Sequence, residues 1–249
     1  ENNTTGSCNI AIGHYAMGSN TTGCLNTGVG HNALTDNTTG EFNTAVGVAL
    51  YNNTTASNNT AVGYNSLATN TTGAGNTAIG LNSLVLNTTG VDNTAVGCGS
   101  LFSNTTASAN TALGRAALRL NTTGDDNVAL GRNAMCSNTT ASNNISIGHE
   151  AMCTNTTGAN NTAVGKSALR SNTTGAYHTA VGVESLKVNT TGERNTALGA
   201  GTLKDNTTGC YNVAIGYDTL SNNTTANDNT AVGYSSLLTN TTGARKTAV

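Results

Sequence analysis

Residues Asn87–Phe102 read NTTGVDNTAVGCGSLF, and variants of this phrase recur along the whole chain. The triplet Asn-Thr-Thr begins fifteen times, and thirteen of the fourteen intervals between successive starts are 17 residues long. The remaining interval, from Asn37 to Asn53, is 16 residues, and the missing residue falls just after Gly47. A fixed period of this size is typical of a solenoid, in which neighbouring coils complete one another's core. We therefore predict an all-β parallel β-solenoid (β-roll) of about fifteen 17-residue coils, forming a single repeat region over residues 1–249.

Charge and hydropathy exclude several classes of protein. Ten Lys and Arg residues against twelve Asp and Glu residues give a net charge of −2, which excludes a generally basic nucleic-acid binder. The sequence contains no apolar run of about 18 residues, so we expect no membrane insertion. The chain starts and stops within a repeat, and we expect it to be an excerpt of a longer fibre protein.

The phase of the repeat predicts which side chains form the core. We number each repeat from the Asn of Asn-Thr-Thr as position 1. Position 10 is aliphatic, position 15 is Leu or Met, and position 8 is Thr, Val or Ile, which favours a strand over positions 7–11. Because side chains alternate along a strand, we expect positions 8 and 10 to point inward and position 9 outward, with a second extended segment carrying position 15. The predicted core residues are Val46, Leu50, Val62, Leu67, Ile79, Leu84, Val96 and Leu101.

Asparagine and glycine are restricted to particular positions. Position 1 is always Asn and position 7 is Asn in thirteen coils, with His178 and Lys246 as exceptions. Each Asn-Thr-Thr is formally a glycosylation sequon, but a coil spacing of ~4.8 Å is too small for a glycan on every coil. Stacked amides that hydrogen-bond between coils are the favoured interpretation. The predicted ladder is Asn37, Asn53, Asn70, Asn87 and Asn104. Gly at position 11 predicts a positive φ or a close backbone approach, whereas position 4, which accepts Ala, predicts ordinary dihedrals.

Small residues at position 9 predict a contact surface. Position 9 is Ala in thirteen coils, with Gly28 and Ser146 as the exceptions, although the alternation places it outside. A tight turn within the coil is the alternative explanation. We expect instead a homotrimer interface through this row, represented by Ala45, Ala61, Ala78, Ala95 and Ala112.

The strand phrases resemble those of known fibre proteins. NTAVG (Asn93–Gly97), NIAIG (Asn9–Gly13) and NISIG (Asn144–Gly148) resemble the S-V-A-I-G repeats in the heads of trimeric autotransporter adhesins. The longer unit NTAVGYNSLATNTTG (Asn59–Gly73) is similar to tandem repeats of phage and other viral tail-fibre proteins and of bacterial surface proteins. The resemblance covers essentially the whole chain. It implies a left-handed parallel β-roll in an extracellular homotrimer on a virion tail fibre or a bacterial cell surface. The receptor or glycan is then expected to bind through regions outside this segment.

The sequence offers little that is typical of catalysis. Cys136 and Cys153 both occupy position 16, in adjacent coils, so we expect their Cα atoms to lie about 5 Å apart. That spacing makes them a candidate disulfide, although free thiols are equally compatible with it. His14 and His31 share position 12 of adjacent coils, but two histidines without a third ligand favour a plain surface over a metal site. The carboxylates are dispersed. We expect no enzyme activity, no catalytic residue, no cofactor and no metal.

Two functions remain. The first is a structural shaft or head segment of an extracellular trimeric fibre that supports attachment to a host or surface. The second is ice binding through the rows of Thr at positions 2 and 3, although adjacent strand residues point to opposite faces, so only one row would be exposed unless the chain turns there.

Overall fold

The computed structural model describes residues 2–249 and shows an all-β parallel β-solenoid of about 14 turns. Glu1, the first residue of the predicted repeat region, lies outside the described residues. The described part of the chain has no helix that is long and apolar enough to cross a membrane. The chain forms two compact units, one that ends at Asp125 and one that covers Asp126–Val249.

Each coil contributes one short strand over positions 8–10 (8–9 in the last coil), which is narrower than the predicted 7–11. The unit that ends at Asp125 contains β1 (Ile10–Ile12), β2 (Thr27–Val29), β3 (Thr44–Val46), β4 (Thr60–Val62), β5 (Thr77–Ile79), β6 (Thr94–Val96) and β7 (Thr111–Leu113). The second unit contains β8 (Val128–Leu130), β9 (Ile145–Ile147), β10 (Thr162–Val164), β11 (Thr179–Val181), β12 (Thr196–Leu198), β13 (Val213–Ile215), β14 (Thr230–Val232) and β15 (Thr247–Ala248).

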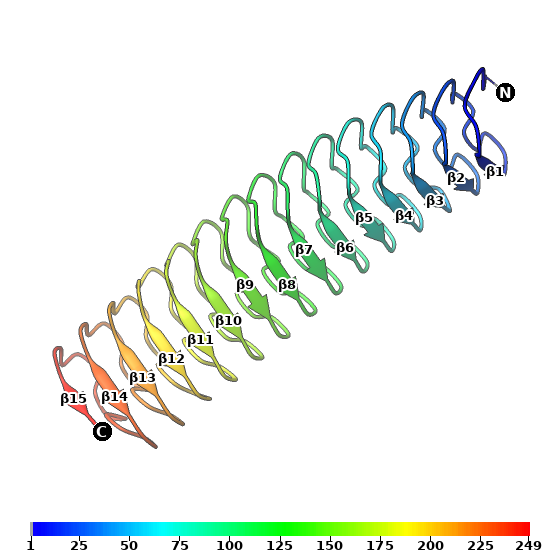
Figure 1. The fold of residues 1–249 in the computed structure, drawn as a ribbon. Coiled ribbons are helices and arrows are strands. Elements are labelled where there is room, and N and C mark those ends of the chain that lie inside the picture. Colours follow the sequence, from blue (N-terminus) through cyan, green and yellow to red (C-terminus); the bar gives the residue numbers. More distant parts are fainter. Residues whose placement is uncertain (1) are drawn as a thin grey trace. The chain divides into compact units, whose positions relative to one another are not determined.

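Consecutive strands within each unit pair in parallel and in register (Figure 1). In β6 and β7, for example, Ala95 pairs with Ala112 and Val96 with Leu113. A residue therefore lies beside the residue at the same repeat position of the next coil. This stacking confirms the predicted period and register.

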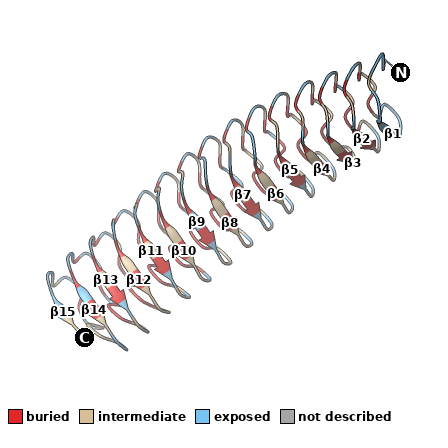
Figure 2. Cartoon of the chain, viewed as in Figure 1, coloured by how far each residue is buried: buried red, intermediate tan, exposed pale blue. Residues whose placement is uncertain are grey.

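The inward and outward faces of the strand are the reverse of the prediction. Position 9 points into the coil, and the five alanines assigned to a subunit interface are completely buried inside their own chain: Ala45, Ala61, Ala78, Ala95 and Ala112. They are therefore not a subunit interface. Buried residues recur at the same place in successive coils (Figure 2).

The predicted core is correct for position 15 and wrong for position 10. Four leucines have no exposed surface: Leu50, Leu67, Leu84 and Leu101. Position 10 lies on the outer face, where Val46 and Ile79 are 38% and 39% exposed. Val62 and Val96 are half-buried.

The narrow interior of the coil explains this reversal. A Cβ atom added to Gly28, at position 9, would lie 3.1 Å from Cγ of Met17, the position-15 side chain of the preceding coil. Outside the first coil, the asparagines at positions 1 and 7 are buried in the same interior. Because protein interiors are closely packed, the remaining space admits a methyl group but not a valine or leucine side chain.

The chain turns at positions 6, 13 and 15 through left-handed backbone conformations. Representative φ values are 56° at Asp92, 53° at Asn82 and 48° at Leu101. Asn and Asp tolerate this region, whereas a leucine there is unusual. The predicted extended segment around position 15 is therefore wrong: the chain turns sharply there, and this turn directs the leucine inward.

The prediction for glycine is confirmed. Gly97, at position 11, has a φ of 130°, and a Cβ atom there would lie 2.7 Å from the carbonyl oxygen of Gly114 in the next coil. The glycines at position 4 have no positive φ, as the acceptance of alanine predicts.

The 16-residue coil lacks the residue of position 13. The carbonyl of Val48 accepts a hydrogen bond from the Asn65 N–H at 2.8 Å, as the carbonyl of Tyr64 does from the Asn82 N–H at 2.9 Å. Val48 therefore occupies position 12, and the next residue, Ala49, is at position 14. The deletion removes one outward side chain and preserves the register of the coil.

Candidate functional site

The predicted asparagine ladder is present and completely buried. Nδ2 of Asn87 donates to Oδ1 of Asn70 at 2.8 Å and to the carbonyl of Gly90 at 3.0 Å, and its own Oδ1 accepts from Nδ2 of Asn104 at 2.9 Å. The same pattern links Asn53 to Asn37 at 2.8 Å. Since these amides have no access to water, their role is to hold the coils together, and they are not accessible for glycosylation.

The position-7 asparagines form a second ladder that sequence analysis did not predict. The backbone N–H of Asn93 donates to Oδ1 of Asn76 at 3.0 Å, and Nδ2 of Asn93 donates to the carbonyl of Ala107 at 2.8 Å. Each amide therefore connects its coil to the next through one accepted and one donated bond. The occurrence of Asn at this position in thirteen coils was the available signal.

His178 replaces asparagine in this second ladder and reproduces its contacts. Its Nδ1 accepts from the backbone N–H of Asn195 at 3.2 Å, and its Nε2 lies 2.7 Å from the carbonyl of Gly192. These partners assign the neutral ring with the proton on Nε2. His178 is 2% exposed, and burial lowers the pKa of its imidazole to about 4.

The sulfur atoms of Cys136 and Cys153 lie 3.0 Å apart, and both residues are free thiols in the structure. The hydrogen bond from Cys153 lowers the pKa of the Cys136 thiol to about 6, whereas the same contact raises the pKa of Cys153. Their oxidation to a disulfide stays a prediction.

In each unit, the outer face of the stacked strands carries two rows of uncharged side chains. Position 8 is Thr, Val or Ile and position 10 is Val, Ile or Leu in every coil, so that no charged residue occurs in either row. Several aliphatic side chains on this face are more than a third exposed: Ile12, Val46, Ile79, Leu113, Val181 and Ile215. A repeated aliphatic row open to water is unusual for a monomeric surface.

The two threonines of each Asn-Thr-Thr have different environments. The hydroxyl of Thr88, at position 2, donates to the carbonyl of Thr105 in the next coil at 3.0 Å, and this contact recurs along the solenoid. The position-3 threonines, such as Thr89, are exposed. One row of threonines is therefore accessible and the other is largely engaged in structure.

Residues that were considered for metal binding do not form a cluster. The rings of His14 and His31 stack with their centroids 5.4 Å apart. Among residues 2–249, no group of three His, Cys, Asp or Glu side chains is arranged to hold a metal ion. Glu184 pairs with Lys187 at 2.8 Å and with Lys204 at 3.2 Å, which neutralises a short row of basic residues.

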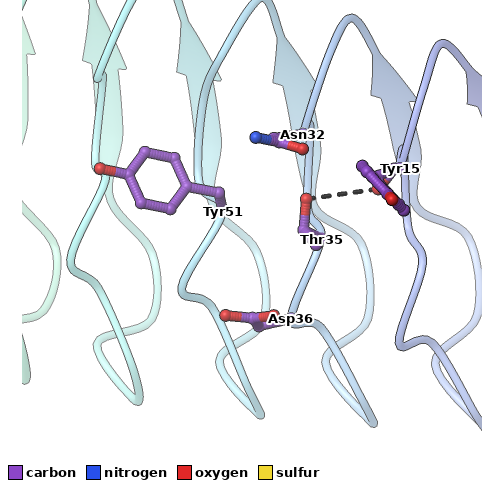
Figure 3. Close-up of a pocket in the computed structure, with 5 residues that line it drawn as sticks. All are labelled: Tyr15, Asn32, Thr35, Asp36 and Tyr51. Carbon is purple, nitrogen blue, oxygen red and sulfur yellow. Dashed lines mark hydrogen bonds between the residues drawn. The ribbon is translucent and has the colours of Figure 1, made fainter.

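A cavity of about 300 Å³ lies beside the 16-residue coil. Tyr15 and Tyr51 lie at opposite ends, and Asn32, Thr35 and Asp36 lie between them (Figure 3). Oγ1 of Thr35 donates to the carbonyl of Tyr15 at 3.3 Å. The cavity thus combines two aromatic rings with an amide and a carboxylate.

Comparisons with known proteins add no functional information. No family model matches the chain, and no curated protein matches it in sequence.

Proposed function

We propose that this chain is a structural shaft or head segment of an extracellular homotrimeric fibre, on a virion tail or a bacterial surface, with left-handed coils and no catalytic role. The observation that supports this proposal is the row of aliphatic side chains on the outer sheet face, together with the absence of charge from positions 8 and 10 in every coil. A face of this kind is stabilised when another protein surface covers it.

The contact between copies involves the Thr and aliphatic rows instead of the alanine row. Each coil offers a strip about 4.8 Å high and about 10 Å wide, or roughly 50 Å². Fifteen coils together offer about 700 Å² for each copy. In a trimer each copy divides this area between two partners, so each pairwise contact takes roughly 350 Å² per copy, below the ~800 Å² of a standard interface, and the assembly depends on all three contacts together. Repetition also suits a spacer, because a face that is the same in every coil provides the same contact along its length.

The native mass tests this proposal. A trimer has three times the chain mass of 24.9 kDa, and we expect that mass by native mass spectrometry and sedimentation. The variant Val46→Glu/Ile79→Glu places charge on the outer face and is expected to give a folded monomer. The matched control is Thr39→Glu/Thr72→Glu on the exposed position-3 row, which we expect to remain trimeric. A wild-type monomer at all concentrations, or a trimeric Val46→Glu/Ile79→Glu variant, contradicts the proposal.

Ice binding is the second candidate, because the position-3 threonines form an exposed row with one residue per coil, about 4.8 Å apart. The position-2 hydroxyls donate hydrogen bonds to backbone carbonyls, so this face presents only one row of threonines, at position 3. A thermal-hysteresis measurement with ice-crystal imaging decides between the two candidates. Faceted ice growth that is lost in Thr72→Lys/Thr89→Lys supports ice binding, whereas unshaped ice rejects it.

A further inference from the structure

Three surface cavities adjoin coils in which position 13 has no side chain. The largest, about 300 Å³, adjoins the coil from which the position-13 residue is missing. A second, about 180 Å³, is lined by Gly99, and a third, about 280 Å³, is lined by Gly201; both glycines occupy position 13. In other coils a left-handed turn directs a side chain outward at this position. Omission of that side chain therefore opens a gap on the same edge of the coil.

The cavity beside the 16-residue coil has the least charged and most aromatic lining of the three. Tyr15 and Tyr51 bracket it, and Asn32 and Asp36 provide an amide and a carboxylate between the rings (Figure 3). The backbone N–H of Asp36 donates to the carbonyl of Tyr51 at 2.9 Å, which joins the acid and one ring across adjacent coils. Asp36 is the only Asp, Glu, Lys, Arg or His among the five lining residues.

We propose that this cavity binds a neutral hexopyranose ring of a glycan. The C–H face of a pyranose packs on a tyrosine ring, which provides apolar contact without a charge requirement. The Asp36 carboxylate and the Asn32 amide accept and donate hydrogen bonds to ring hydroxyls. The same carboxylate disfavours sialylated or sulfated sugars, because like charges repel. The volume of about 300 Å³ accommodates one ring of this size.

The other two cavities are built from similar gaps but have different chemistry. The cavity at Gly99 includes Phe102 together with Arg115 and Arg119. At Gly201, the Asp218 carboxylate occupies the space that a side chain would fill. These cationic and acidic linings lack the pair of aromatic rings. The cavities at Gly99 and Gly201 can therefore be compared with the proposed site within the same chain.

The proposed site is independent of trimer formation. Its residues occupy positions 13, 16 and 17, whereas the outer sheet face comprises positions 8 and 10. Sugar binding and self-association are measured separately, so that failure of one proposal is distinguishable from failure of the other.

Titration of the full chain with methyl β-D-glucopyranoside and methyl β-D-galactopyranoside tests the inference. For a ligand of this size in a shallow cavity we expect a dissociation constant of about 1 mM for at least one glycoside. The measurement is saturation-transfer-difference NMR together with chemical-shift perturbation of the tyrosine ring signals. Choline chloride is titrated in parallel, because an aromatic cavity with a carboxylate also suits a quaternary ammonium ion.

Two kinds of variant locate the binding. Tyr51→Ala is expected to weaken binding by at least tenfold, and the matched control Tyr64→Ala removes an exposed tyrosine elsewhere and leaves affinity unchanged. Insertion of one Asn between Val48 and Ala49 restores position 13, fills the cavity and is expected to abolish binding while circular dichroism shows an intact fold.

Three results overturn the proposal. The first is no saturation with either glycoside up to 50 times the expected dissociation constant of about 1 mM. The second is saturation by choline that sugar does not compete with. The third is an unchanged sugar affinity in both Tyr51→Ala and the insertion variant.

Discussion

The inner and outer faces of a single strand obey different rules in this molecule. The inner face, at position 9, accepts only Ala, Gly and Ser, and the alanines there are buried except in the two terminal coils, at Ala11 and Ala248. The outer face, at position 10, accepts Val, Ile and Leu, and these side chains are partly open to water. In a coil this narrow, a strand position that accepts only small residues points into the interior. A strand position that holds large aliphatic residues points outward. Burial here is limited by volume and not by hydrophobicity.

Polar groups on the inner face must also find partners inside. At Ser146, Oγ donates to the carbonyl of Ala151 at 2.9 Å, so that a hydroxyl replaces the usual methyl without an unpaired donor. The asparagine ladders solve the same problem on a larger scale. The following predictions test the contrast between the two faces, from the largest expected effect to the smallest.

The largest expected effect on the free energy of unfolding comes from a change of pH, which acts through the buried His178. Its pKa in the folded chain is about 4 and its ordinary value is 6.5, so that below pH 6.5 the unfolded chain binds a proton that the folded chain does not. Above pH 6.5 the imidazole is neutral in both states, so it does not lower the free energy of unfolding. Below pH 6.5 the free energy of unfolding falls, by about 3 kcal/mol as the pH approaches 4. Urea unfolding at pH 7.5 and pH 4.5 measures the loss.

The His178→Asn variant is the control, because it restores the residue found in thirteen other coils. We expect it to remove most of the difference between the two pH values. An identical pH dependence in wild type and variant contradicts the assignment of a buried neutral imidazole.

Ala95→Leu is expected to lower the free energy of unfolding by about 2 kcal/mol, because the interior has no space for three more carbon atoms. Val96→Leu adds one methylene group on the outer face of the same strand and is expected to change stability by less than about 0.5 kcal/mol. Denaturant midpoints with unchanged slopes provide the comparison. Equal effects of the two substitutions would falsify the inside–outside assignment.

Asn87→Ala is expected to cost roughly 1–2 kcal/mol, because it removes the donor to Oδ1 of Asn70 and the acceptor of Asn104 within a buried ladder. Thr89→Ala, on the exposed position-3 row two residues away, should change stability by less than about 0.5 kcal/mol. Thermal and urea unfolding of the two variants measure the difference. A neutral Asn87→Ala variant is incompatible with a structural role for the ladder.

Ser66→Ala is expected to increase stability by about 1 kcal/mol. The Ser66 hydroxyl is buried without a hydrogen-bond partner, and such a group costs free energy. Alanine occupies the same position in other coils, as at Ala49 and Ala117, so the variant introduces no new packing. Ser83→Ala is the control, since that hydroxyl donates to the carbonyl of Gly80 at 3.2 Å. A destabilised Ser66→Ala variant contradicts the prediction.

Periodicity predicted much of the fold from the sequence. The spacing of Asn-Thr-Thr predicted parallel coils in register, the position-1 ladder and the backbone conformation at Gly97. It placed the missing residue just after Gly47, whereas the structure places the gap one residue later, after Val48. These features depend on repetition and on the special properties of Asn and Gly, both of which are local in the sequence.

The orientation of the strand could not be obtained in the same way. Alternation fixes the relative direction of Ala95 and Val96, but the choice between the two faces depends on the interior volume, which the turn at Leu101 determines. A leucine with a positive φ is a tertiary effect that propensity does not predict. The cavity beside Tyr51 likewise depends on which side chain the deletion removes.

A methyl NOESY spectrum tests the inside–outside assignment most directly. All three methionines lie at position 15, and all six isoleucines lie at positions 8 or 10. In protein labelled at the Met, Ile and Ala methyl groups, we predict Met–Ala cross-peaks and no Met–Ile cross-peaks at short mixing times. Strong cross-peaks between Ile147 and Met135 or Met152 would place position 10 inside the coil and contradict the account.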